Sequence, residues 1–267
     1  MNKQLADYHI HTSLCNHANG AMKAYVKQAI TLGLCEMGFA DHNPLPAHFN
    51  NPYRMLTDEM SNYLEIIHDL RQQFPQIIIR TGIELDYIES ATDFLEKLVT
   101  ENKFDYVIGS VHYLQSDAKD QLAYLSEFSH EDTTRLFHAY FDHLEKAIKT
   151  GWFDIIGHFD LPRRFWGDLP DETIERAGHI LEQIKDYDLC LEVNTSGFRT
   201  KNVEEPFPNF NLLQKVRALD IPVTLGSDAH QPGDVGSYFQ ETKALLKQIG
   251  FEYIYFFENH RRIPHKI

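Results

Sequence analysis

Short apolar runs recur along the chain and are separated by longer stretches with the apolar spacing of amphipathic helices. Because apolar runs of about four to eight residues are typical of buried strands, we expect seven strands. They are Leu5–His11, Glu36–Ala40, Ile77–Glu84, Tyr106–Val111, Asp154–Gly157, Cys190–Asn194 and Pro222–Gly226. A further aromatic-rich run, Phe251–Phe257, is interpreted as a packed strand near the end of the chain.

Helices are predicted between these strands. Their boundaries are Gly20–Leu32, Thr57–Phe74, Ala91–Glu101, Glu131–Thr150, Glu172–Tyr187, Leu212–Leu219 and Phe239–Ile249. Several of them end at residues that stop helices, namely Gly33, Pro75, Gly151 and Gly250. Strand and helix therefore alternate along the whole chain.

This alternation implies parallel strands joined by right-handed crossovers. Seven such units without a Ser/Gly-rich linker predict an α/β fold, a closed or nearly closed TIM-like barrel in a single domain that spans residues 1–267. A doubly wound open sheet is the competing architecture. The glycine-rich dinucleotide loop and the Walker A loop are absent from the sequence, so the chemistry must come from other residues.

Charge and composition narrow the class of partner. The chain has 25 basic and 39 acidic residues, a net charge of −14, which argues against a broad surface for nucleic acid or anionic lipid. We expect a small-molecule substrate, no nucleic-acid partner and no membrane, and leave the oligomeric state open. Without a long apolar run or a signal-peptide core, the sequence predicts a cytoplasmic protein. Its three cysteines lack Cys-x-x-Cys spacing and indicate neither a disulfide framework nor a thiolate zinc finger.

The fifteen histidines are the unusual feature, because seven of them, with two carboxylates, lie at or just after predicted strand ends. Barrel enzymes assemble their sites at the C-terminal ends of strands. Residues i and i+2 of a strand face the same way, so His9 and His11 could reach one ion. Each residue alone could be an ordinary polar side chain, but together they predict a metal site. The candidate ligands are His9, His11, His17, His42, Glu84, His112, His158, Asp228 and His230.

Two further segments carry arginines near the same strand ends. The loop after the fifth strand offers Arg163 and Arg164 beside Asp160, and a polar run at the end of the sixth strand finishes with Arg199. Guanidinium groups suit bidentate contacts to phosphate. We expect Arg199 and one of Arg163 and Arg164 to bind phosphate oxygens, with a surface ion pair as the alternative for each.

Taken together, these residues resemble the polymerase-and-histidinol-phosphatase (PHP) superfamily and, within it, the monofunctional histidinol-phosphate phosphatases of bacterial histidine biosynthesis. The superfamily motifs occur in the family order as His9-Ile10-His11, His17, Ala40-Asp41-His42, Gly82-Ile83-Glu84, Ser110-Val111-His112, Gly157-His158 and Ser227-Asp228-Ala229-His230. The narrower resemblance rests on chain length and on the segments Gly157–Phe165 and Glu192–Arg199.

The resemblance implies a distorted (β/α)7 barrel that holds three divalent metal ions. It assigns His9, His11, Glu84 and Asp228 to the first ion, a bridging Glu84 with His112 and His158 to the second, and His17, His42 and His230 to the third. These mixed ligands suit zinc, iron or manganese, and zinc is our first expectation.

The implied reaction is hydrolysis of L-histidinol phosphate to L-histidinol and phosphate. Paired metals lower the pKa of bound water to about 7, so a hydroxide bridging the first two ions would attack phosphorus. Asp160 or a metal-bound water would protonate the leaving alkoxide, and Asn43 is a candidate contact to the organic part of the substrate. The alternatives are a PHP-type phosphatase or phosphodiesterase acting on another small phosphorylated metabolite or nucleotide, a non-catalytic metal-stabilised module, and a partner-binding protein without metal.

Overall fold

Seven parallel strands form the centre of the computed structural model, which describes residues 5–115, 122–129 and 132–267. The strands are β1 (Ala6–Asp7), β2 (Glu36–Phe39), β3 (Ile78–Asp86), β4 (Tyr106–Ser110), β7 (Ile155–Ile156), β8 (Cys190–Asn194) and β9 (Val223–Gly226), and they are hydrogen-bonded in that order. Every neighbouring pair is parallel. Each strand overlaps the run predicted for it, and the one clear extension is β3, which continues past Glu84 to Asp86.

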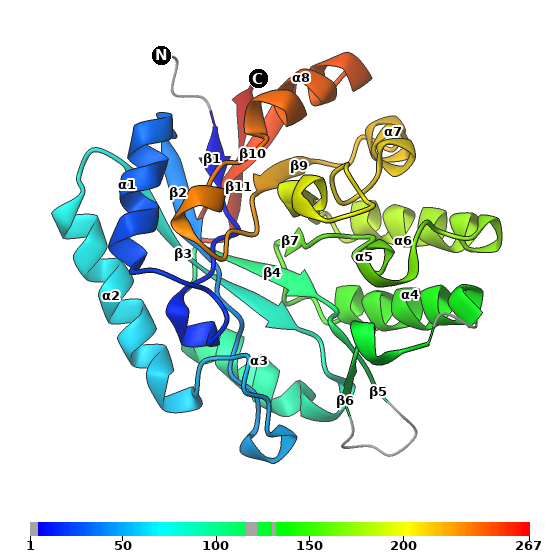
Figure 1. Ribbon diagram of the computed structural model, residues 1–267, viewed down its shortest axis with the longest axis horizontal. Coiled ribbons are helices and arrows are strands. Elements are labelled where there is room, and N and C mark those ends of the chain that lie inside the picture. Colours follow the sequence, from blue (N-terminus) through cyan, green and yellow to red (C-terminus); the bar gives the residue numbers. More distant parts are fainter. Residues whose placement is uncertain (1–4, 116–121, 130–131) are drawn as a thin grey trace.

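The sheet closes into a barrel because β1 lies beside β9 (Figure 1). The Tyr8 N–H donates to the Leu225 carbonyl at 3.2 Å, and the Ala229 N–H donates to the His9 carbonyl at 3.1 Å. The predicted TIM-like barrel is therefore confirmed, and the open doubly wound alternative is wrong.

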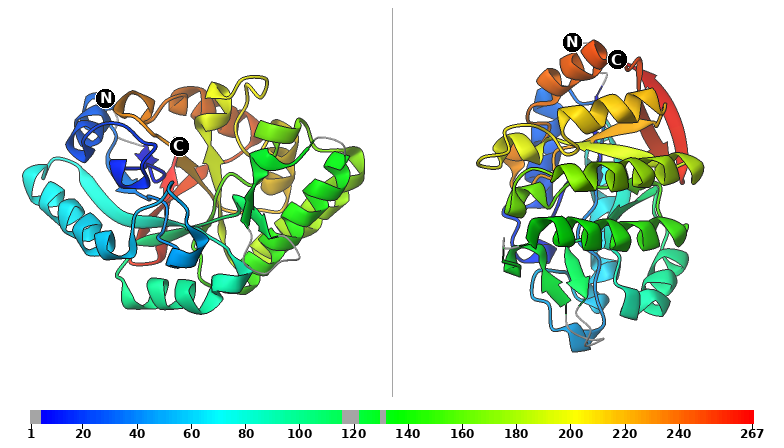
Figure 2. Two further views of the ribbon diagram at one scale, coloured as in Figure 1. Left: turned by 60° about the horizontal axis from the view of Figure 1, so that its bottom comes forward. Right: turned by 90° about the vertical axis from the view of Figure 1, so that its right-hand side faces the viewer.

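Helices surround the barrel, as the views in Figures 1 and 2 show. They are α1 (Met22–Leu32), α2 (Met60–Gln73), α3 (Thr92–Glu101), α4 (Thr133–Lys149), α6 (Ile174–Asp186), α7 (Phe210–Ala218) and α8 (Phe239–Ile249), with a short α5 (Arg163–Trp166). In α4 the buried residues Phe137, Phe141, Leu144 and Ile148 recur every three or four positions, so one face of that helix packs inward. All seven predicted helices are present, although the expected start at Glu131 lies outside the described residues.

A C-terminal hairpin closes the end of the barrel where the strands begin. It consists of β10 (Tyr253–Glu258) and β11 (Arg261–Lys266), paired antiparallel. The Phe257 N–H donates to the Tyr8 hydroxyl at 3.1 Å, and the His260 N–H donates to the carbonyl of Asp105, the residue before β4, at 2.7 Å. With this end covered, the opposite end, where the strands finish, is left for a site.

Irregular segments gather at that opposite end. They include the small hairpin of β5 (Tyr113–Gln115) and β6 (Leu122–Tyr124) and several single 3₁₀ turns. Those turns are η1 (Ser13–Cys15), η2 (Ala47–Phe49), η3 (Thr57–Glu59), η4 (Glu89–Ala91), η5 (Leu125–Glu127), η7 (Asp171–Thr173), η8 (Thr195–Arg199) and η9 (Pro232–Asp234). Within the described part of the chain, no helix is long and apolar enough to span a lipid bilayer.

Candidate active site

A cluster of imidazoles and carboxylates lies at the end of the barrel where the parallel strands finish. Its members come from distant parts of the sequence: His9 and His11 lie shortly after the end of β1, whereas Asp228 lies shortly after the end of β9. Parallel strands end at the same edge, so side chains separated by more than two hundred residues in sequence meet there. The other members are His17 after η1, His42 after β2, Glu84 in β3, His112 after β4, His158 after β7 and His230 after Asp228.

Glu84 is the centre of this cluster and is 1% exposed. Its Oε1 lies 2.9 Å from His158 Nε2 and accepts a hydrogen bond from the Ser110 hydroxyl at 2.7 Å. Its Oε2 lies 3.5 Å from His9 Nε2 and 3.6 Å from His11 Nε2. One carboxylate therefore faces imidazoles on both of its oxygens, which is the position a bridging ligand requires.

Several polar atoms of the cluster are buried without a hydrogen-bond partner. Glu84 Oε2, His9 Nε2 and His11 Nε2 are among them, as is His42 Nδ1, which lies 2.9 Å from Glu84 Oε2 without forming a hydrogen bond. The 3.5 and 3.6 Å separations between these atoms exceed a good hydrogen bond but match two ligands of one ion, since two bonds of about 2.1 Å at a tetrahedral angle place their donors roughly 3.4 Å apart. The donor set and its unsatisfied atoms fit a divalent metal.

A second layer of buried carboxylates holds three of the histidines from behind. Glu192 Oε1 lies 2.6 Å from His9 Nδ1, and Asp86 Oδ1 lies 2.8 Å from His112 Nδ1. Asp41 Oδ1 lies 3.3 Å from the Nδ1 of His11. A carboxylate that accepts the Nδ1–H fixes the tautomer, so Nε2 carries the lone pair and points to the cluster.

The electrostatics of the cluster affect its carboxylates and its individual imidazoles differently. Burial alone would raise the pKa of Glu84, but the charges of His42 and His9 outweigh it and hold that pKa well below its usual range. Burial lowers the pKa of His42 to about 4 and that of His230 to about 2. These two imidazoles are therefore neutral. Burial lowers the pKa of His9 as well, but the charges of Glu192 and Glu84 outweigh it and raise that pKa well above its usual value, so protons on such imidazoles balance the ionised Glu84 until a metal replaces them.

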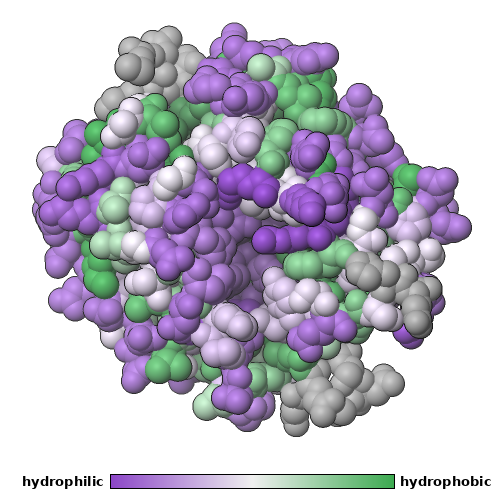
Figure 3. Space-filling model, in the orientation of Figure 1, coloured by the Kyte–Doolittle hydropathy of each residue, from purple (hydrophilic) through white to green (hydrophobic). Residues whose placement is uncertain are grey.

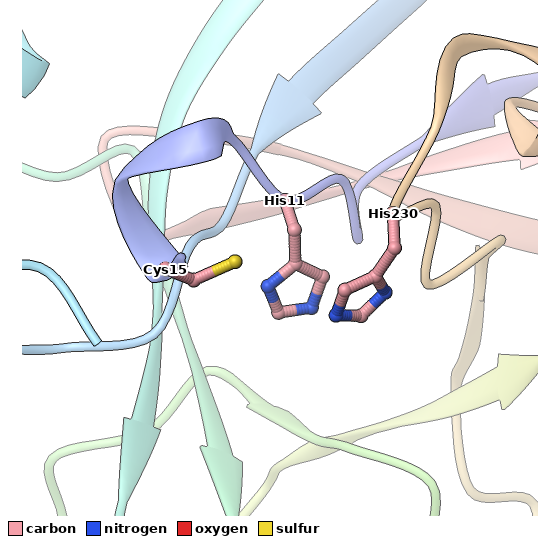
Figure 4. Close-up of side chains that lie close together, drawn as sticks. All are labelled: His11, Cys15 and His230. Atoms are coloured by element: carbon pink, nitrogen blue, oxygen red, sulfur yellow. The ribbon is translucent and has the colours of Figure 1, made fainter. Parts of the chain in front are cut away.

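Among the described residues, the ligand atoms also fall into groups of three that could each hold an ion. These groups are His9, His11 and Glu84; His42, Glu84 and His112; His17, His42 and His230; and His11, Cys15 and His230. Figure 4 shows the last group, in which the Cys15 thiol from η1 points toward the His11 ring, next to His230. The structure thus brings together all nine candidate ligands, whose individual roles stay predictions.

Two cavities of about 510 and 500 Å³ adjoin the cluster and share His17, His42 and Tyr124 in their walls. Figure 3 shows a hollow near the centre of this face, bordered by hydrophilic residues. The second cavity is lined by Arg164, by Arg199 and by the metal-ligand candidate Asp228. Asp234 lines it too, with its Oδ1 3.8 Å from Arg199 Nε. Among the described residues Arg164 has no carboxylate partner, so the cavity offers an uncompensated guanidinium beside the cluster, as a phosphate site requires.

The structure places the two arginines of α5 differently. Arg164 is exposed and lines the cavity, whereas Arg163 is 3% exposed and is paired with Asp160, Asp168 and Glu205. Of the two, only Arg164 is therefore available to a phosphate group.

Two other predicted residues are not brought to the cavities. Asp160 is fully buried, accepts the Asn209 N–H at 3.0 Å and is absent from both cavity walls. Asn43 is also fully buried; its Oδ1 accepts hydrogen bonds from Arg54 at 3.1 Å and from the Asp86 N–H at 2.9 Å. Both side chains therefore form buried hydrogen bonds beside the site and do not face either cavity.

Comparison with known proteins agrees with this geometry. A model of the PHP domain matches residues 7–196, which is more than half of the chain. This chain belongs to the PHP family. It is 36% identical over 260 residues to a probable histidinol-phosphatase of Deinococcus radiodurans, covering 97% of this chain and 98% of that protein. It is 28% identical over 261 residues to the histidinol-phosphatase of Bacillus subtilis, covering 89% and 97%.

A solved PHP structure supports the same fold. The histidinol phosphate phosphatase of Lactococcus lactis, determined with zinc, L-histidinol and phosphate, matches this chain with a TM-score of 0.78 and 22% identity. The match covers 98% of this chain and 99% of that one. At this identity the likeness establishes the barrel fold.

Sequence reasoning missed the supporting carboxylates of this PHP site. In the sequence Glu192 stands only as the first residue of the segment that ends in Arg199, yet its carboxylate faces His9 and the His158 N–H inside the barrel. Asp86 lies beyond the predicted end of its strand at Glu84, and the sequence pattern assigns it no role. In both cases the sequence does contain a signal: an acidic residue inside or at the end of a buried strand needs a hydrogen-bond or charge partner, which predicts a contact to one of the nearby histidines.

Proposed function

We propose that this PHP-family protein is a metal-dependent phosphomonoesterase that hydrolyses L-histidinol phosphate to L-histidinol and inorganic phosphate. The observation that carries the proposal is the buried cluster of unpartnered imidazole and carboxylate atoms, which opens into a cavity with two arginines. The end-to-end identity of 36% with a probable histidinol-phosphatase supports the choice of substrate. In this proposal residues 1–267 act as a single PHP-type phosphoesterase domain.

The cofactor in this proposal is a set of three divalent ions, with zinc preferred over iron or manganese. The first ion would be held by His9, His11, Glu84 and Asp228, the second by Glu84, His112 and His158, and the third by His17, His42 and His230. When bound, such ions neutralise phosphate charge and supply activated water at neutral pH.

The arginines of the chain would bind and orient the phosphate group. Arg199 is fixed by hydrogen bonds to the Ser237 hydroxyl and to the Ser227 carbonyl, at 2.5 and 2.6 Å, so its guanidinium is already ordered beside Asp228. Arg164 faces the same cavity from α5 and has no such fixed partners among the described residues. We propose that Arg199 gives a preorganised contact and that Arg164 adds a second, adjustable one.

Asp160 would help this site indirectly. Burial raises its pKa to about 6, against the lowering effect of the nearby Arg163 charge. Because its carboxyl group reaches neither cavity, we propose that it positions the loop after β7, which carries His158, rather than passing its own proton to the leaving oxygen.

The test is phosphate release from L-histidinol phosphate compared with sugar phosphates, nucleotides and a phosphodiester, with bound metals counted on the same preparation. A strong preference for histidinol phosphate with close to three metals per chain is expected. A metal-loaded protein that prefers another ester would retain the metal-dependent phosphatase and reject this substrate. No metal and no turnover would reject both.

Arg199→Ala tests the phosphate contact separately. We expect a higher KM or a lower kcat, because a contact to phosphate is lost. The metal content should stay unchanged, because Arg199 belongs to none of the ligand groups and bonds only the backbone carbonyl of Asp228, not its carboxylate. Wild-type kinetics in this variant would exclude Arg199 as a phosphate ligand.

A further inference from the structure

The two cavities beside the cluster differ in the charge that they offer. The cavity of about 500 Å³ contains Arg164 and Arg199, together with the metal-ligand candidate Asp228 and with Asp234, which lies 3.8 Å from Arg199. The cavity of about 510 Å³ is lined by aromatic rings, among them Tyr53, Tyr113 and Tyr124. Its volume lies within the range of about 300–1,000 Å³ that is usual for small-molecule sites.

Only one negative charge in the aromatic cavity is available to a ligand among the described residues. The cavity contains two charged side chains, those of Arg54 and Glu127. Arg54 is 3% exposed, is paired with Asp86 and has its guanidinium 5.3 Å from the centre of the Tyr113 ring, so its charge is already compensated. Glu127 is exposed and forms no ion pair with a described arginine or lysine.

Glu127 is also held in place. Its Oε1 accepts a hydrogen bond from the backbone N–H of Tyr124 at 2.9 Å, at the start of η5. The Tyr124 ring stacks on His112, with ring centres 6.2 Å apart and planes at 9°, and it lines both cavities. The carboxylate is therefore fixed in the wall of the aromatic cavity, bonded to the backbone of the residue whose ring lines both cavities.

From this arrangement we infer that the aromatic cavity binds the organic, cationic end of the phosphate ester and that Glu127 supplies its counter-charge. This inference rests on the proposed function. In L-histidinol phosphate the ammonium and imidazole groups lie only a few bonds from the phosphorus atom, so a phosphate group held at the arginines and the cluster would place them in the adjoining cavity. Aromatic faces and a carboxylate together bind such a cation by cation–π and charge-assisted contacts.

The consequence for specificity is a division of labour between the two cavities. The arginine cavity binds the phosphate group, which every phosphomonoester has in common. The aromatic cavity binds the positively charged group, which sugar phosphates and nucleotides lack at this distance from phosphorus. Glu127 is thus assigned as a specificity-determining residue.

Glu127→Gln is the matched test, because the amide oxygen can still accept the Tyr124 N–H while the charge is lost. The zinc-loaded enzyme is assayed with L-histidinol phosphate, with O-phosphoethanolamine as a smaller cationic ester, and with p-nitrophenyl phosphate as an ester without a cation. Glu241→Gln, an exposed position on α8, serves as the control and should leave all three activities unchanged.

We expect Glu127→Gln to lower kcat/KM for L-histidinol phosphate about tenfold more than for p-nitrophenyl phosphate, mainly through KM. Calorimetry should show about tenfold weaker binding of L-histidinol, with a smaller change in inhibition by inorganic phosphate. Melting temperature and zinc content confirm that the variant is folded and loaded.

Equal losses on the cationic and neutral esters, or no loss, would overturn the inference. The proposed function is judged separately, by whether the wild-type enzyme prefers histidinol phosphate. If the wild type prefers O-phosphoethanolamine and Glu127→Gln removes that preference, the cation subsite stands and the histidinol assignment fails.

Discussion

Glu192 offers a sharp test of how the buried carboxylates prepare the metal site. Its Oε1 lies 2.6 Å from His9 Nδ1, while its Oε2 accepts the His158 N–H at 2.8 Å and the Asn194 side-chain amide at 3.0 Å. The change Glu192→Gln keeps the shape of the side chain but replaces one oxygen by an NH₂ group. Because Oε2 accepts two hydrogen bonds, the glutamine oxygen should take that position and the NH₂ group should face His9.

This orientation would reverse the tautomer of His9. Facing a donor, His9 Nδ1 must become the acceptor, so the proton moves to Nε2, the atom that points toward Glu84 and Asp228. A protonated Nε2 cannot bind a metal. Loss of such an outer contact typically weakens metal binding 10- to 100-fold, which corresponds to about 1.4–2.8 kcal/mol.

Zinc affinity measured by competition with a chromophoric chelator is the direct assay. We expect Glu192→Gln to lose 10- to 100-fold in affinity for at least one ion, and phosphatase activity to return in part when zinc is added in excess. The exposed Glu241→Gln variant is again the control. If zinc affinity stays within about twofold of wild type while the melting temperature is unchanged, the tautomer argument is refuted.

Five further outcomes are expected from the same geometry. In Gly226→Ala the new Cβ would lie 1.9 Å from Glu192 Oε1, so zinc content on purification should fall. Arg164→Ala should weaken inhibition by inorganic phosphate. Arg163→Ala should destabilise the fold by about 3–5 kcal/mol in urea unfolding, because it leaves the buried Asp160 carboxylate without its ion pair. In Asp160→Asn, kcat should fall less than tenfold, since loss of a true general acid costs about 10²–10⁴-fold. Chelation of zinc should lower the melting temperature by several degrees in calorimetry, because each site filled at 100 times its Kd contributes about 2.7 kcal/mol; an unchanged melting curve would contradict it.

The barrel was predictable because its strands are buried on both sides and therefore appear as continuous apolar runs. β8 has the predicted boundaries Cys190–Asn194, and β9 differs from its prediction by one residue. The hairpin of β5 and β6 was not predicted, since Tyr113–Gln115 and Leu122–Tyr124 are too short to show a pattern of their own. Strand order and register came from the structure alone, because they depend on contacts between residues that are distant in sequence.

The candidate site was predictable to a different degree in its two layers. The inner residues could be named because the C-terminal ends of parallel strands meet at one end of the barrel, so histidines at these strand ends lie close together even when they are far apart in sequence. The choice between Arg163 and Arg164 could not be made, because neighbouring residues of one short helix point in different directions. The role that we infer for Glu127 could not be predicted from the sequence either, because it depends on the cavity that this exposed glutamate lines.

The charge of the inner cluster links the folding of this protein to its metal content. Glu84, Asp228 and Glu192 are all at least nine-tenths buried at one end of the barrel, and no arginine or lysine within the described residues pairs with them. Although burial lowers the pKa of His9, the charges of Glu192 and Glu84 outweigh it and raise that pKa well above its usual value. The carboxylates therefore require positive charge, from protons on the imidazoles or from metal ions. Because the unpartnered donor atoms already lie at distances that suit ligands of one ion, we expect metal ions to replace these protons and to stabilise the same barrel, more strongly as the pH rises.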